Sequence, residues 1–145
     1  MERPFFTVVM PAYGVEKYLK KAVDSIRNQT FEDWELIIVE DGSPDRTGEL
    51  ADRLAGKDSR IQAVHHEKNK GLSEARNTGI RHAKGKYIWF MDPDDSVEKS
   101  LLQDVWKAQQ ENPARLTVFG HVEEYYEKDG SFSYGHPVKP HGRLC

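Results

Sequence analysis

Short apolar runs alternate with amphipathic segments along the chain, and this alternation constrains the fold more than any other feature of the sequence. The runs are rich in β-branched and aromatic residues, which favour strands, and they span residues 5–10, 34–39, 61–64, 87–91 and 116–120. Between them, apolar residues recur at the spacing of one helical face. Strands that alternate with helices across short connections predict an α/β fold with three α/β/α layers around a mostly parallel, twisted sheet. Ligands of such sheets bind beyond the carboxyl ends of the strands.

The fourth run, Tyr87–Met91, stops abruptly in the acidic sequence Asp92-Pro93-Asp94-Asp95. A run of about five apolar residues is typical of a strand that is buried on both faces of a sheet. Asp92 and Asp94 point the same way if the backbone stays extended. Carboxylates gathered in this way need a cation or hydrogen-bond donors, and their hard oxygens suit Mg²⁺ or Mn²⁺. The alternative is that Asp95, or the serine after it, caps the next helix while the other two acids face water.

The loops after the first two runs carry candidate contacts for a nucleotide base. Asp41, at the end of the second run, could accept a hydrogen bond from a ring N–H such as the imide of uracil. The alternative is an ordinary Asp–Gly turn. Tyr13 follows Pro11, the residue that we expect to close the first strand, and its ring could lie flat against a base. The alternative is a half-buried surface tyrosine.

A third candidate segment lies near the start of the helix predicted before the fourth run. Arg76 and Lys70 could meet phosphate or ribose oxygens, the arginine through its planar guanidinium group. The alternative is a solvated helical face, because Glu74 lies nearby. The alternative for Asn69 is that it only caps the helix.

The composition excludes several classes of protein. The chain has 145 residues, of which 37% are hydrophobic and 31% charged, which suits one domain with a real core. No stretch approaches the roughly 18 apolar residues of a membrane span, and the N-terminus lacks the apolar region of a secretory signal, so we expect a cytoplasmic location. A net charge of -3, with acids and bases interspersed, argues against nucleic-acid binding. The six histidines show no ligand spacing and are interpreted as structural or solvent-facing.

Four blocks of the sequence, taken together in their order and spacing, resemble the family 2 glycosyltransferases, which are nucleotide-sugar-dependent enzymes of the Rossmann-like GT-A fold. The blocks are residues 8–13, 35–45, 69–79 and 90–95. Two positions depart from the family pattern: Gly14 stands where asparagine is usual, and Glu40 stands where aspartate is common. The longer glutamate reaches further and is expected to alter the hydrogen bonding behind Asp41.

The resemblance implies a role for each candidate residue. Tyr13 and Asp41 would hold the uracil of a UDP-sugar, and Asp92 would lie near the ribose and sugar. Asp94 would bind a Mn²⁺ or Mg²⁺ ion that bridges the diphosphate. The remaining contacts to the nucleotide would come from Pro11, Ala12, Asn69 and Arg76.

The resemblance also implies a reaction, in which the hydroxyl of a glycan or lipid-linked acceptor displaces the nucleoside diphosphate with inversion. Residues 1–122 are expected to form the nucleotide-sugar-binding domain. Residues 123–145, with a hairpin turn at Asp129-Gly130, would begin an acceptor-binding region. No residue clearly fills the role of the general base, so we expect this chain to bind the donor but to transfer poorly alone. The full-length protein is expected to associate peripherally with membranes.

Two rival functions remain open on the sequence. One is a nucleotide-sugar-binding module without catalysis of its own. The other is a receiver-type signalling domain, which would require an acidic pair after the first strand, where the chain has Pro11, Ala12 and Tyr13. A dinucleotide-dependent oxidoreductase would require Gly-x-Gly-x-x-Gly at the same place, and that motif is absent from the sequence.

Overall fold

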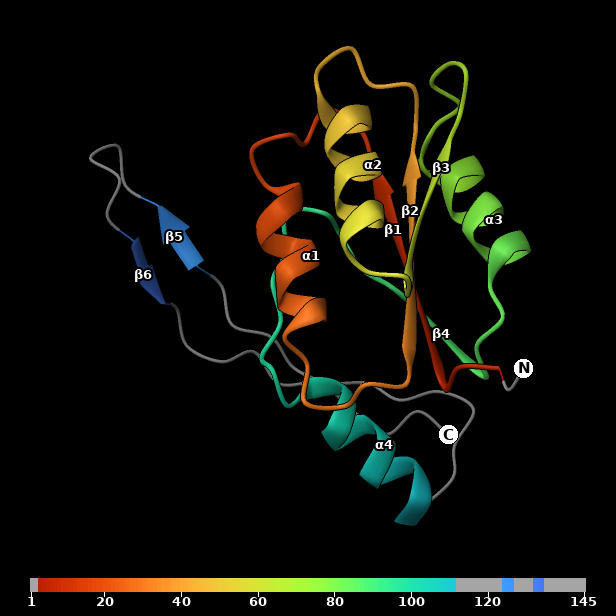
Figure 1. The fold of residues 1–145 in the computed structure, drawn as a ribbon. Coiled ribbons are helices and arrows are strands. Elements are labelled where there is room, and N and C mark those ends of the chain that lie inside the picture. Colours follow the sequence, from red (N-terminus) through yellow and green to blue (C-terminus); the bar gives the residue numbers. More distant parts are fainter. Residues whose placement is uncertain (1–2, 112–123, 127–131, 135–145) are drawn as a thin grey trace. The chain divides into compact units, whose positions relative to one another are not determined.

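The computed structural model describes residues 3–111, 124–126 and 132–134. In order, the elements are β1 (Phe6–Ala12), α1 (Leu19–Arg27), β2 (Trp34–Glu40), α2 (Thr47–Lys57), β3 (Ile61–His65), α3 (Leu72–His82), β4 (Tyr87–Phe90), α4 (Leu101–Glu111), β5 (Glu124–Tyr126) and β6 (Phe132–Tyr134). Strands β1 to β4 form a parallel sheet in the order β3-β2-β1-β4. Helices α1 and α2 cover one face and α3 the other (Figure 1), which confirms the predicted α/β/α layers.

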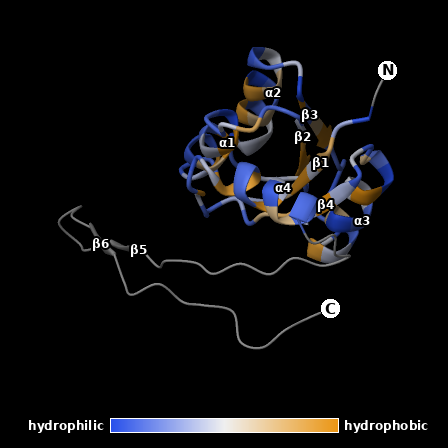
Figure 2. Ribbon diagram, turned by 90° about the horizontal axis from the view of Figure 1, so that it is seen from below, coloured by the Kyte–Doolittle hydropathy of each residue, from blue (hydrophilic) through white to orange (hydrophobic). Residues whose placement is uncertain are grey.

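The core lies between the two central strands and the helices on either side of them. Every residue of β1 is buried, and β2 is buried at all but one position. The apolar side chains of α1 face this core, and four of them are buried: Leu19, Ala22, Val23 and Ile26. Viewed from below, the apolar residues of the strands lie inside the layers of helices (Figure 2). Burial of such a stripe is what holds a short helix on a sheet.

Helix α3 approaches β1 closely because it carries a glycine at the contact. A Cβ atom added at Gly79 would collide with the side chain of Val9. Val9 also packs with Ile37, Val39 and Ala75 in one buried cluster. The close contact fixes α3 over β1 and β2, which are the two strands that it contacts most.

That position of α3 explains why the prediction for β4 was partly wrong. The strand is present at Tyr87–Phe90, but Ile88 is 42% and Phe90 40% exposed, so it is not buried on both faces. The register pairs Ile88 with Thr7 and Phe90 with Val9, which places both side chains on the α3 face. Among the described residues, β4 is the edge strand beside β1, and α3 lies over the other side of β1.

Pro11 does not close β1, as the sequence had suggested, because the strand continues to Ala12 and Pro11 pairs with Val39 of β2. The reason lies in the alternation of the hydrogen bonds. The Val9 carbonyl accepts from the Met91 N–H, on the β4 side, and Pro11 faces that same side two residues later. Strand β4 has already ended at Phe90, so no ladder bond requires the missing N–H of the proline.

The structure divides into two compact units, residues 1–103 and residues 104–145. In the second unit, β5 and β6 pair antiparallel, which confirms the predicted hairpin strands. The turn at residues 129–130, the strand predicted at residues 116–120 and the domain boundary predicted after residue 122 lie outside the described residues. No helix in the described part of the chain is long and apolar enough to span a membrane.

Candidate functional site

The loops beyond the carboxyl ends of the strands in the first unit enclose a cleft of about 280 Å³. It is lined by Pro11, Ala12, Tyr13, Asp41, Asn69, Gly71, Leu72, Ala75 and Pro93. The loops after β2 and β3 stand together at the upper end of the sheet in Figure 1. Parallel strands end on the same edge, so the topology brings together segments that lie far apart in the sequence. Five of the residues predicted to contact the nucleotide line this one cleft: Pro11, Ala12, Tyr13, Asp41 and Asn69.

Asp41 is the most constrained of these residues, with only 4% of its surface exposed. Its Oδ1 atom lies 2.9 Å from the Lys70 backbone N–H and 2.7 Å from Nδ1 of His66. Its Oδ2 atom accepts from the Gly71 N–H at 3.0 Å. A carboxylate offers about four lone-pair positions, so the described contacts leave one position on Oδ2 for a ligand.

These contacts also determine the charge of Asp41. Burial raises the pKa of its carboxyl group, but the hydrogen bonds from Lys70, His66 and Gly71 outweigh burial, and the pKa lies below its ordinary value. Asp41 is therefore an ionised group at neutral pH and acts only as an acceptor. It is suited to a ring N–H and not to a ring nitrogen that lacks a proton.

The turn beside Asp41 brings two loops into contact. Gly42 has a φ of 67°, and a Cβ atom there would lie 2.6 Å from the carbonyl carbon of Lys68 and 2.7 Å from the Asn69 nitrogen. Only glycine allows both the positive φ and this close approach. Asp41 and Gly42 therefore form the turn that was the alternative to a binding role, and the same turn presents the carboxylate to the loop after β3.

The loop after β1 is tied to the loop after β2 as well. The Gly14 N–H donates to Oγ of Ser43 at 3.1 Å, and the Val15 N–H donates to Oγ1 of Thr47 at 2.9 Å. Between these anchored segments and β1, Tyr13 lines the cleft with 51% of its surface exposed. An exposed ring at the wall of a cleft is available to stack on a flat ligand.

Glu40, the last residue of β2, bonds to the loop that follows this strand. It is 5% exposed, and its carboxylate accepts from the Ser43 N–H and contacts Nδ1 of His65 at 2.9 Å. Burial raises the pKa of Glu40, yet the hydrogen bonds from Ser43 and His65 lower it below its ordinary value. The glutamate side chain thus bonds to Ser43 in the loop after β2 and to His65 at the end of β3.

The acids after β4 gather in an exposed turn. Oxygen atoms of Asp92, Asp94 and Asp95 all lie within 4.8 Å of one another. The Asp95 N–H donates to the Asp92 carbonyl at 3.1 Å, so the backbone turns here. The extended backbone, which was the condition for Asp92 and Asp94 to point the same way, is therefore not present. Three hard oxygen donors at this separation fit a divalent cation such as Mg²⁺ or Mn²⁺. Pro93, within the same turn, lines the cleft.

The helix-cap alternative for these acids is wrong. Helix α4 begins at Leu101, well beyond Asp95 and Ser96, and the Leu101 N–H donates to the Glu98 carbonyl. The acidic turn and the first turn of α4 are therefore separate features.

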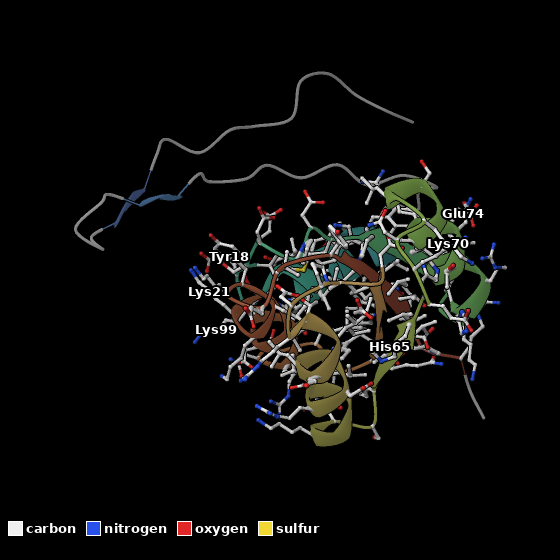
Figure 3. All side chains as sticks on the ribbon, turned by 90° about the horizontal axis from the view of Figure 1, so that it is seen from above. Tyr18, Lys21, His65, Lys70, Glu74 and Lys99 are labelled. Carbon is white, nitrogen blue, oxygen red and sulfur yellow. The ribbon has the colours of Figure 1, made fainter. Side chains whose placement is uncertain are left out.

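Arg76 lies near the end of β4. Its guanidinium carbon lies 5.8 Å from the centre of the Phe90 ring, at the end of β4. Its Nε atom is buried and has no hydrogen-bond partner among the described residues. Glu74, the residue that suggested a solvated face, pairs instead with Arg81 at 4.0 Å. Arg76 thus offers an unsatisfied cationic donor, whereas Lys70 and Glu74 extend as exposed side chains near the start of α3 (Figure 3).

His66 is the residue at this site that the sequence did not reveal. Interpreted only as structural or solvent-facing, it proves to be 9% exposed and to contact Asp41 directly. The histidines lacked metal-ligand spacing, which was the only signal sought. Its place at the end of β3, on the same edge as Asp41, was the signal that could have identified it.

Comparisons with known sequences identify relatives of this chain. The sequence model of glycosyl transferase family 2 matches residues 7–141. The glycosyltransferase EpsJ of Bacillus subtilis (strain 168) is 43% identical over 117 residues, which cover 81% of this chain and 33% of EpsJ. The glycosyltransferase GlyG of Streptococcus pneumoniae is 38% identical over 128 residues, which cover 88% of this chain and 42% of GlyG. The chain thus spans less than half the length of either relative.

Solved structures share the fold. Residues 1–349 of Staphylococcus aureus TarS, in complex with UDP, match with a TM-score of 0.69 and 29% identity, over 74% of this chain and 32% of that one. The mannosyltransferase PcManGT of Pyrobaculum calidifontis, in complex with GDP-Man and Mn²⁺, matches with a TM-score of 0.68 and 26% identity, over 74% of this chain and 33% of that one. Both neighbours share the fold of this chain, and each was solved with a nucleotide or a nucleotide sugar bound.

Proposed function

The chain belongs to glycosyl transferase family 2, and on that premise we propose that it binds the nucleotide-sugar donor of an inverting, metal-dependent glycosyltransferase, with a UDP-sugar as that donor. The observation that carries the proposal is the cleft at the carboxyl edge of the sheet. It joins a buried carboxylate with one open acceptor position, an exposed aromatic ring and a turn of three acids. These are the groups that a base, its ring face and a diphosphate-bound cation require.

The base end of the cleft selects by hydrogen bonding. Asp41 accepts from the ring N–H of the base, and Tyr13 stacks on its face, a contact worth about 1 to 3 kcal/mol. Uracil and guanine carry a ring N–H beside a carbonyl, whereas cytosine and adenine present an unprotonated ring nitrogen that an ionised carboxylate rejects. The backbone at Pro11 and Ala12 lies against the nucleoside. UDP and GDP are the nucleotides present in the neighbouring structures of TarS and PcManGT.

The diphosphate end of the cleft holds the cation. Asp94 would hold Mn²⁺ or Mg²⁺, and Asp92 would lie on the ribose and sugar side. Asp95 would be close enough to share the ion, because its carboxylate lies within 4.8 Å of theirs. The cation, when bound, neutralises charge on the departing diphosphate. Arg76 meets an oxygen of the nucleotide through its guanidinium group, and Asn69 contacts the nucleotide from the wall of the cleft.

The transfer step needs an acceptor and a base in addition to this cleft. A hydroxyl of a glycan or lipid-linked acceptor attacks in line and displaces the nucleoside diphosphate, while a carboxylate removes the hydroxyl proton. We identify no such carboxylate in the described part of the chain beyond those assigned to the donor. We therefore expect the 145-residue chain to bind donor and to turn over poorly, and rapid transfer to a defined acceptor by this chain would contradict that expectation.

Calorimetric titration tests the proposal. We expect UDP to bind in the presence of Mn²⁺ at least about tenfold more tightly than CDP, because a charge-assisted hydrogen bond is worth about 1.5 to 3 kcal/mol. Asp94→Ala should abolish the effect of Mn²⁺, while Glu49→Ala, which removes an exposed acid of α2, should leave it intact. Binding that is indifferent to both metal and base would overturn the proposal.

A further inference from the structure

A continuous chain of hydrogen bonds runs from the surface of α3 to the buried carboxylate in the cleft. Nη2 of Arg81 lies 3.0 Å from Oγ1 of Thr78, and that oxygen lies 2.8 Å from Nε2 of His66. Nδ1 of His66 then lies 2.7 Å from Oδ1 of Asp41. The side chains of His66 and Asp41 are 6% and 5% exposed, so water does not compete for this contact.

The buried end of the chain fixes the direction of its last bond. The ionised Asp41 can only accept, so Nδ1 of His66 must carry the proton that is donated to Oδ1. At the other end, arginine can only donate, so Thr78 accepts from Arg81. The same Thr78 hydroxyl contacts Nε2 of His66, so both ring nitrogens have a polar partner.

The consequence falls on the carboxylate. Lys70 N–H and His66 together fill both positions on Oδ1, which prevents the carboxylate from rotating to exchange its oxygens. The open position consequently stays on Oδ2, next to the Gly71 N–H at the wall of the cleft. His66 is itself anchored, because its backbone N–H donates to the Glu40 carbonyl at 2.9 Å.

We propose that His66 is a positioning residue for recognition of the donor base, and that Thr78 holds the opposite side of its ring. His66 touches no ligand; it holds Asp41 in the one orientation that presents Oδ2 to a ring N–H. This inference rests on the proposed function, since it assigns to His66 the geometry on which that function depends. It adds a specificity determinant, just after β3, that lies behind the residues lining the cleft.

Two substitutions test the contacts of the two imidazole nitrogens separately. In His66→Asn, the amide nitrogen takes the place of Nδ1 and can still donate to Asp41. In His66→Gln, the amide takes the place of Nε2, which keeps the contact to Thr78 and loses the one to Asp41. The measurement is the dissociation constant of UDP with Mn²⁺ for the whole 145-residue chain. We expect His66→Asn to bind within about threefold of the wild type and His66→Gln to bind about tenfold more weakly.

A modified nucleotide shows whether the loss occurs at the base. UDP methylated at N3 of uracil has no ring N–H to donate, so we expect it to bind the wild type about tenfold more weakly than UDP does. It should then bind His66→Gln no more weakly than it binds the wild type. If both His66 variants weaken UDP equally, or if His66→Gln weakens the methylated nucleotide as strongly, the histidine acts only through folding and the inference is overturned.

The remaining outcomes are also decisive. Nitrogen NMR of the wild-type imidazole should report a protonated Nδ1, a measurement that does not depend on whether the variants fold; an unprotonated Nδ1 overturns the inference. Thr78→Val should weaken UDP binding and Thr78→Ser should restore it. A wild type that binds neither UDP nor GDP overturns the proposed function and this inference together, whereas normal wild-type binding with no contrast between the His66 variants overturns the inference alone.

Discussion

The surroundings of Asp41 and the acidic turn after β4, which we propose as the base end and the acidic end of the cleft, are built in opposite ways. At the base end, Asp41 is 4% exposed and its carboxylate accepts from two backbone N–H groups and a histidine. At the acidic end, Asp92, Asp94 and Asp95 are exposed, with their oxygens within 4.8 Å of one another. The first end is complete before any ligand arrives. The second places like charges together, which is unfavourable until a cation neutralises them.

With the function proposed above, the two ends contribute to nucleotide-sugar binding in different ways. A carboxylate that is already oriented loses little freedom when a ligand binds, so the base end can discriminate between nucleotides. Exposed acids gain their favourable interactions only when the ion and the diphosphate are present. Substitutions at the base end should therefore affect folding and binding together, whereas substitutions at the acidic end should affect binding alone.

The largest effect should follow Asp41→Ala. The substitution leaves the Lys70 and Gly71 N–H groups and the His66 ring without their acceptor, and each buried donor left unpaired costs about 1 to 3 kcal/mol. We expect the free energy of unfolding to fall by about 3 kcal/mol or more in urea denaturation. Asp94→Ala, the matched change at the acidic end, should alter it by no more than about 0.5 kcal/mol. Equal losses for the two variants would erase the contrast between the ends.

The next effect concerns the contact between the loops at the base end. Gly42 and Gly14 both have positive φ values, 67° and 63°, but a Cβ atom meets the Lys68 and Asn69 backbone at Gly42 and nothing within 4 Å at Gly14. Gly14→Ala should cost about 1 to 2 kcal/mol from backbone strain alone. Gly42→Ala should cost at least about 1 kcal/mol more and should weaken UDP binding, because the loops must separate. If thermal unfolding shows similar losses of stability for both variants, the close approach of Gly42 to the Lys68 and Asn69 backbone contributes little.

Local patterns in the sequence were sufficient for the order of the elements. The residues of β1 to β4 carry the branched and aromatic composition of strands, and the ends of these strands lie within two residues of the prediction. Helix α4 ends at Glu111, directly before an Asn-Pro pair in the sequence, which disfavours a helix. The parallel order then brought Pro11, Tyr13 and Asp41 to one edge, because all carboxyl ends of a parallel sheet share that edge.

The features that were predicted wrongly, or were not predicted, depend on contacts between distant segments. The burial of β4 was predicted wrongly because its apolar run does not indicate where α3 lies. The position of α3 is fixed by the contact of Gly79 with Val9. The role of His66 depends on the loop that Gly42 brings against Lys68. The acids after β4 predicted a site, but the turn that gathers them depends on the Asp95 N–H meeting the Asp92 carbonyl.

A smaller effect should appear in the pH dependence of stability. Hydrogen bonds from His65 to Asp52 first, and then to Glu40, raise the pKa of His65, although burial opposes them. The stabilisation is therefore complete below the unfolded pKa of about 6.5 and is lost as the pH rises through the higher folded value. Its size should be below about 1 kcal/mol, because His65 and Asp52 are partly exposed and screened by solvent. Urea denaturation at pH 6 and pH 8.5 measures the loss. His65→Gln should flatten this dependence; an unchanged slope would exclude His65 as its source.

The smallest effect should appear at the acidic end, where its sign is the informative quantity. Asp94→Asn removes one negative charge from a cluster of three while keeping the shape of the side chain. Without divalent metal, relief of repulsion should raise the free energy of unfolding by a few tenths of a kcal/mol, within the range of exposed charge pairs. With Mn²⁺ and UDP, the wild type should gain stability by mass action and the variant should gain much less, so the order of the two proteins reverses. Thermal unfolding with EDTA and then with the two ligands measures both orders. An Asp94→Asn variant that is less stable than the wild type in EDTA would mean that the acidic turn, like Asp41, is held by bonds within the folded chain.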